Sequence, residues 1–232
     1  MTLNRIKLYI SILIVTILSL NTIHAKAGVD GSPFEGSYLG FVTTKSTFAA
    51  VGTLGQFDDS DNPSIFNSIA STTSKNSYGG GFFAGYGLKF GSLYTSAEGA
   101  FIIDKGNTIF SDGTNTIKFA KSNTLDLNLR GGMEISDRAL VFALIGYSGT
   151  NIKSDGINGR QNKDAGGINY NKRLTSFRYG AGIEVAIYEN IAIRAEYTRS
   201  IIGSDIYIDG SDLFSIKPKT SRIMFSVVLH MY

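Results

Sequence analysis

In the segment from Tyr78 to Phe90, residues of two kinds alternate along the sequence, and this alternation limits the folds that the chain can adopt. Its even positions are mostly aromatic or aliphatic, whereas its odd positions are nearly all glycine. Successive side chains of a β-strand point to opposite faces, so the pattern predicts a strand with one broad apolar face and one face of small residues. A soluble sandwich would bury that apolar face, whereas a narrow barrel in lipid would expose it and keep small residues inside.

Four further segments alternate in the same way, and their second face carries charged residues. Between Thr124 and Glu134, Leu127 lies on one face while Asp126 and Arg130 lie on the other. Apolar residues outward and polar residues inward are the signature of a transmembrane β-barrel. The four segments are Leu93–Ile103, Thr124–Glu134, Thr175–Ile187 and Ile191–Arg199.

Three less regular segments complete a set of eight predicted strands: Phe34–Ser46, Leu140–Ser148 and Lys217–Tyr232. The segment Leu140–Ser148 is apolar on both faces, so its inward side stays open, as does the register of the final strand. The connections alternate between short and long, and the long ones are rich in Ser, Asn, Asp and Gly. These long connections span residues 47–75, 104–119, 149–173 and 205–216.

An alternation of short and long connections is typical of outer-membrane barrels, which have short periplasmic turns and longer extracellular loops. Lipid offers no hydrogen bonds to the backbone, and a closed sheet pairs every N–H and C=O internally. The sequence therefore predicts an all-β protein, a single eight-stranded antiparallel transmembrane up-and-down β-barrel with short periplasmic turns and four long extracellular loops.

The amino terminus has the pattern of a cleavable secretory signal peptide. Arg5 and Lys7 precede the apolar stretch Leu8–Leu20, and Ala25-Lys26-Ala27 fits the small-residue cleavage site. A helical membrane anchor is the alternative, but a helical span needs about 20 apolar residues. We therefore expect a signal peptide at residues 1–27, a barrel at residues 28–232, and export to the outer membrane of a Gram-negative cell.

Cleavage would also change the charge of the chain. It would remove three of the 22 Lys and Arg residues and none of the 19 Asp and Glu residues, which leaves equal numbers of each. A basic surface for nucleic acid is therefore not expected.

The charged residues on the second faces are predicted to point into the barrel. Glu98 and Arg130 each lie six residues from a short turn, so they are expected to face one another across paired strands. A buried charge is costly unless it is paired, so we interpret the set as an ion network that fills the lumen, with a polar gate of a narrow pore as the alternative. The predicted network is Glu98, Asp126, Arg130, Glu134, Arg178, Glu184, Arg194 and Glu196.

The apolar faces are predicted to contact lipid, and tyrosines near their ends are candidates for interfacial girdles. The predicted lipid-facing residues are Phe82, Tyr86, Leu88, Leu125, Leu127, Leu129, Phe177, Tyr179, Ile183, Val185, Ile193 and Tyr197. The girdle candidates are Tyr86, Tyr94, Tyr179, Tyr188 and Tyr197.

Nothing in the sequence indicates a cofactor, a metal site or a catalytic centre. The chain has no cysteine and two histidines, which excludes thiolate and multi-histidine metal sites. Of these, His230 falls at the periplasmic end of the last predicted strand, away from external substrates, and no acid pair stands out. We therefore expect no enzymatic activity.

Three motifs resemble the small outer-membrane β-barrel superfamily, namely Phe34–Gly40, Phe177–Glu184 and Asn190–Tyr197. This superfamily includes OmpA-like membrane domains, porin-family barrels and bacterial surface antigens. The resemblance implies a terminal aromatic residue that the barrel-assembly machinery recognises, and Tyr232 matches it. One departure concerns the alternate positions before the terminus, where His230 and Ser226 replace the apolar residues usual in the family.

The expected role is structural or one of surface interaction, as in an antigen or adhesin, because binding sites usually lie in loops on a rigid scaffold. A porin-type channel for small solutes is the alternative. The expected partners are outer-membrane lipid, the barrel-assembly machinery, and a surface ligand or host partner bound through residues 47–75 and 149–173.

Overall fold

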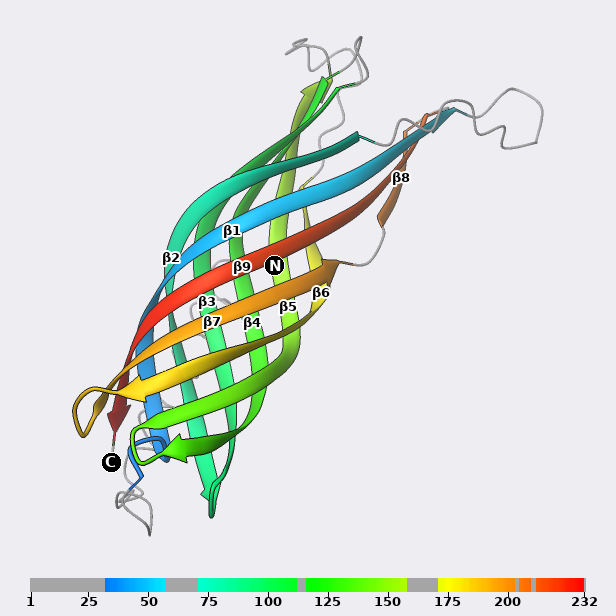
Figure 1. The fold of residues 1–232 in the computed structure, drawn as a ribbon. Coiled ribbons are helices and arrows are strands. Elements are labelled where there is room, and N and C mark those ends of the chain that lie inside the picture. Colours follow the sequence, from blue (N-terminus) through cyan, green and yellow to red (C-terminus); the bar gives the residue numbers. More distant parts are fainter. Residues whose placement is uncertain are drawn as a thin grey trace, which may run out of the picture.

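The protein is a closed antiparallel β-barrel (Figure 1). The computed structural model describes residues 32–56, 71–111, 116–157, 171–202, 205–209 and 212–231. Eight long strands form the wall, and a short strand, β8, pairs only with β9. The strands are β1 Gly36–Gln56, β2 Ser71–Phe90, β3 Leu93–Ser111, β4 Thr116–Ser136, β5 Ala139–Ile157, β6 Asn171–Ala186, β7 Ile191–Ile202, β8 Asp205–Asp209 and β9 Asp212–Met231.

Pairing of β1 with β9 closes the barrel, from Ser37 opposite Met231 to Gln56 opposite Asp212. The paired residues climb as they go around the wall, because the strands of a barrel are tilted and staggered. When paired residues are followed from strand to strand around the barrel, the path from Tyr38 on β1 ends at Phe48, ten residues further along the same strand. The residues between them on this path are Gly85, Glu98, Asn128, Gly146, Arg178, Ser200 and Thr220.

Side chains alternate between the inside and the outside of the barrel in every long strand where they are described. In β5, Leu140 and Leu144 are buried while Ile145 is exposed, which fixes the orientation that the sequence left open. In β9, the buried series contains His230 and the exposed series is apolar, which fixes the register of this strand. Among the described residues, no helix has the length and apolar character needed to cross a membrane.

The strands continue well beyond the ends that the sequence indicated. Much of the expected loop sequence at residues 47–75, 104–119, 149–173 and 205–216 is paired strand. A membrane-spanning strand needs only about 9–11 residues, and β1 has 21 residues, far more than that length. Pairing of β2 with β3 stops at Gly79 and Asp104, and the projecting strands divide there, with β1, β2, β8 and β9 in one group and β3–β5 in another (Figure 1).

The inward glycines of β2 make room for large side chains of the neighbouring strands. A Cβ at Gly85 would lie 2.5 Å from the ring of Tyr38 and 2.6 Å from the carbonyl oxygen of Ala97. The glycine face predicted from the sequence therefore receives Tyr38, which is fully buried in the lumen.

Candidate functional site

A continuous series of ion pairs runs through the lumen, and it begins near the short turns. The carboxylate of Glu184 lies 2.8 Å from His230 Nε2 and accepts a hydrogen bond of 2.7 Å from Arg194 Nε. The Nη1 atom of Arg194 then reaches Glu98 at 2.6 Å, across the lumen from β7 to β3. These contacts join residues of four strands, β3, β6, β7 and β9.

Arg130 occupies the middle of the series. Its guanidinium holds Glu98 through two bonds, of 2.6 and 2.7 Å, and its Nη2 atom lies 2.9 Å from Glu196. Arg178 continues from Glu196 at 2.9 Å to Asp126. Bonds of this kind between ionised partners are roughly twice as strong as neutral hydrogen bonds.

The upper part of the series involves Arg222 and Lys121. Arg222 lies 2.8 Å from Asp126 and 3.6 Å from Asp104, and Lys121 lies 2.5 Å from Asp104. Ser46 also donates a 2.7 Å hydrogen bond to Asp104. We call the whole series the charge ladder, with the members His230, Glu184, Arg194, Glu98, Arg130, Glu196, Arg178, Asp126, Arg222, Asp104 and Lys121.

The charge ladder balances its own charges. Four arginines and Lys121 face five carboxylates, and every member is buried. Removing ions from water costs several kcal/mol each, so these groups are tolerated only because each one meets an opposite charge. Aromatic rings add to this, since the guanidinium of Arg194 lies 4.9 Å from the Phe83 ring centre and 5.2 Å from that of Tyr38.

The structure places seven of the eight residues of the predicted network in the charge ladder. The eighth, Glu134, lies apart near the short turns, where it is 2.7 Å from Lys89 and accepts a hydrogen bond from Ser32. Five interior partners were not in the predicted set: Tyr38, Asp104, Lys121, Arg222 and His230. Arg222 and His230 alternate with the apolar residues of the last predicted strand, so the sequence could have placed them inside. Asp104 fell within an expected loop.

All twelve residues predicted to face lipid are exposed on the outside of the barrel, from Val185 at 38% to Leu127 at 64%. Whether they contact lipid stays a prediction. Tyr94 was wrongly placed among the girdle candidates, because it shares the parity of Ser96 and is buried in the lumen. The signal peptide and Tyr232 lie outside the described residues.

The lumen has almost no free space at the middle of the charge ladder. A cavity of about 10 Å³ lies between Phe83, Glu98, Arg178 and Met224, which is about the space that one water molecule needs. No group of three or more metal-ligating side chains occurs among the residues that the structure describes. His230 and Glu184 form an acid–base pair, but both side chains are buried at the end of the barrel with the short turns.

A family model described as the outer membrane protein beta-barrel domain matches residues 13–229, so the chain belongs to this family of outer-membrane β-barrels. The short turns are accordingly periplasmic, and the projecting strands are extracellular.

Similar folds occur among the solved structures. OprG from Pseudomonas aeruginosa is 12% identical, with 87% of this chain and 99% of that chain covered and a TM-score of 0.47. Neisserial surface protein A, NspA, is 11% identical, with 82% and 97% covered and a score of 0.44. The protease OmpT from Escherichia coli is 9% identical, with 84% and 95% covered and a score of 0.41. These similarities carry no argument about function. A search of the curated proteins found no match.

Proposed function

We propose that the protein is a non-enzymatic outer-membrane barrel with a structural or surface-interaction role, antigen-like or adhesin-like, carried by its extracellular part. The observation that carries this proposal is the filled lumen. The side chains of Arg130, Arg178 and Glu98 are nearly inaccessible to solvent, and the cavity among them has a volume of about 10 Å³. An eight-stranded barrel has an interior just wide enough for side chains, so little space remains for a solute path.

Family membership alone does not decide whether the protein is an enzyme. The interior offers little support for catalysis. His230, the only histidine of the described residues, is held by Glu184 among the aromatic rings of Phe34 and Tyr38. A general base must reach the proton that it removes, and this ring is buried.

The extracellular strands supply a scaffold for binding. Strands β1 and β2 extend far beyond the membrane-spanning length, and they flank residues 57–70. Strands β5 and β6 do the same for residues 158–170. We propose that a surface ligand or host partner binds through residues 47–75 and 149–173, and that the chain reaches the outer membrane after cleavage of residues 1–27.

Two measurements test this proposal. In planar bilayers, the refolded mature chain is expected to give no regular single-channel steps, and steady conductance would instead support a porin. Bacteria that display the full chain are expected to adhere to cultured epithelial cells, and replacing residues 158–170 by a short Gly/Ser linker is expected to reduce adhesion. The same replacement at residues 112–115 is the matched control. Adhesion that is unchanged in both variants would contradict the role of residues 149–173.

A further inference from the structure

Among the side chains that the structure describes, those on the outer surface of the extracellular half carry charge of one sign. Six basic side chains are exposed there, and the described outward side chains of that half include no Asp or Glu. The exposed carboxylates Asp137 and Glu189 lie instead in the short turns at the opposite end. The six cations are Lys45 on β1, Lys105 on β3, Lys153 on β5, Arg173 on β6, Arg199 on β7 and Lys219 on β9.

These cations lie where the apolar outer face gives way to polar residues. Lys105 follows Ile103 along β3, Lys153 follows Tyr147 along β5, and Arg173 precedes Phe177 on the descending strand β6. A Lys or Arg at this level can place its charge at the membrane surface while its stem covers apolar groups.

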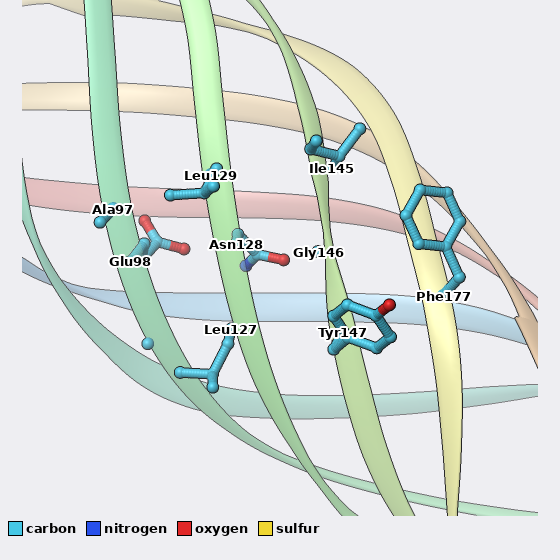
Figure 2. A pocket seen from close by; sticks show the side chains of 10 residues that line it. Ala97, Glu98, Leu127, Asn128, Leu129, Ile145, Gly146, Tyr147 and Phe177 are labelled. Atoms are coloured by element: carbon cyan, nitrogen blue, oxygen red, sulfur yellow. The ribbon is translucent and has the colours of Figure 1, made fainter.

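A groove lies below three of these cations on the lipid-facing side of β3–β6. Its volume is about 480 Å³, which is in the range of small-molecule sites. Figure 2 shows Leu127 and Leu129 on β4 between Ala97 on one side and Ile145, Tyr147 and Phe177 on the other. Gly99 adds to the hollow, since a Cβ there would meet only Leu127, at 3.8 Å. The groove is therefore apolar and formed where the outward residues of β3 are small.

One contact connects the groove with the cations above it. Arg173 crosses from β6 to β5, where its Nη2 atom donates a hydrogen bond of 3.4 Å to the carbonyl oxygen of Gly149. Gly149 is two residues beyond Tyr147, which forms part of the groove wall. The guanidinium is thus held over the extracellular end of the groove.

We propose that this face binds a phosphorylated glycolipid of the outer leaflet, with an acyl chain in the groove and a phosphate at Lys105, Lys153 and Arg173. The groove is continuous with the outer surface that an outer-membrane barrel presents to hydrocarbon. Basic residues near an anionic lipid surface strengthen binding to it, and guanidinium binds phosphate through two parallel bonds. This proposal rests on the orientation of the barrel and is independent of whether the loops bind a host partner.

A second copy of the chain fits this face less well. A two-fold dimer places the same patch of both subunits together, so it would bring the basic residues of each copy against those of the other. Like charges placed together across an interface oppose association. A phosphate that lacks a hydrocarbon tail would leave the groove unused.

The experiment is native mass spectrometry of the full mature chain, refolded in dodecyl maltoside and incubated with bisphosphorylated hexa-acyl lipid A. The wild type is expected to retain a single lipid. The triple variant K105Q/K153Q/R173Q is expected to lower the retained fraction roughly tenfold or more, because three cations are lost. Gly99→Leu fills the groove and is expected to lower retention several-fold. Heat-modifiable migration in gels shows that each variant has folded.

Matched controls separate the site from general attraction. The triple variant K45Q/R199Q/K219Q removes the same charge from β1, β7 and β9, away from the groove, and retention is expected to be unchanged. Gly131→Leu adds the same side chain at an outward glycine of β4, where an added Cβ would have nothing within 4 Å. This variant is also expected to leave retention unchanged. The proposal is overturned by equal losses in the controls, or by equal retention of phosphatidylglycerol or of fully dephosphorylated lipid A.

Discussion

Arg130 shows how a single side chain of the charge ladder supports several others. It binds Glu98 and Glu196 at once, and its guanidinium lies 5.3 Å from the Phe142 ring centre. Both carboxylates have a second basic partner, Arg194 for Glu98 and Arg178 for Glu196. Loss of Arg130 would therefore leave two buried carboxylates with half of their compensation.

Arg130→Met tests the energetic role of this residue. We expect the free energy of unfolding to fall by about 3–5 kcal/mol, the range for removing one partner of a buried ion pair. Urea unfolding of the refolded barrel in detergent, followed by heat-modifiable migration, measures the change. Arg199→Met, on the exposed face of β7, is the matched control and is expected to change the value little. An unfolding midpoint that Arg130→Met leaves in place would contradict the pairing.

The sequence is informative about which side of the wall a residue faces and much less so about its partner across the lumen. Alternation placed Arg130 and Glu98 inside, on adjacent strands, where a pair could be foreseen. The contact between Asp126 and Arg222 joins β4 and β9, which are not neighbours in the sheet. Such contacts depend on the stagger and diameter of the closed barrel, and neither can be obtained from the local pattern.

Among the strands, the polar extensions at the extracellular end were the part that the sequence did not predict. Alternation arises when one face of a strand meets hydrocarbon and the other meets the interior. Beyond the bilayer both faces meet water, so segments such as 71–77 contain mostly Ser, Thr and Asn and resemble a loop. The structure pairs this segment with β1 from Ser71 opposite Gly52 to Ser77 opposite Ser46.

Hydrogen exchange can test where the wall divides. Strand β2 pairs with β3 only from Gly79 to Phe90, so between Ser71 and Tyr78 its second edge has no partner in β3. Amides of this segment that point toward β1 are expected to exchange at least about tenfold more slowly than those that point away, because exchange requires an opened hydrogen bond. NMR-detected exchange in micelles measures this alternation. The paired residues 45–52 of β1 are the control, and uniform protection along Ser71–Tyr78 would contradict the division.

For the molecule as a whole, the charge ladder and the outer cations should respond differently to salt. Buried ion pairs are screened much less than exposed ones. We expect the free energy of unfolding, measured by urea denaturation in neutral detergent, to change by less than about 1 kcal/mol between 0.05 and 1 M NaCl. A large loss of stability in high salt would mean that water and ions enter the lumen.

The β1–β9 seam joins the first strand of the barrel to its last. Ser37 and Leu39 pair with Met231 and Leu229, so the start of β1 depends on the end of β9 for one of its two neighbours. A chain truncated before Leu229 would leave the start of β1 with an open edge and would lose His230, the terminal member of the charge ladder. Such truncated chains would then expose unpaired amides to the periplasm, a feature that distinguishes them from closed barrels before insertion.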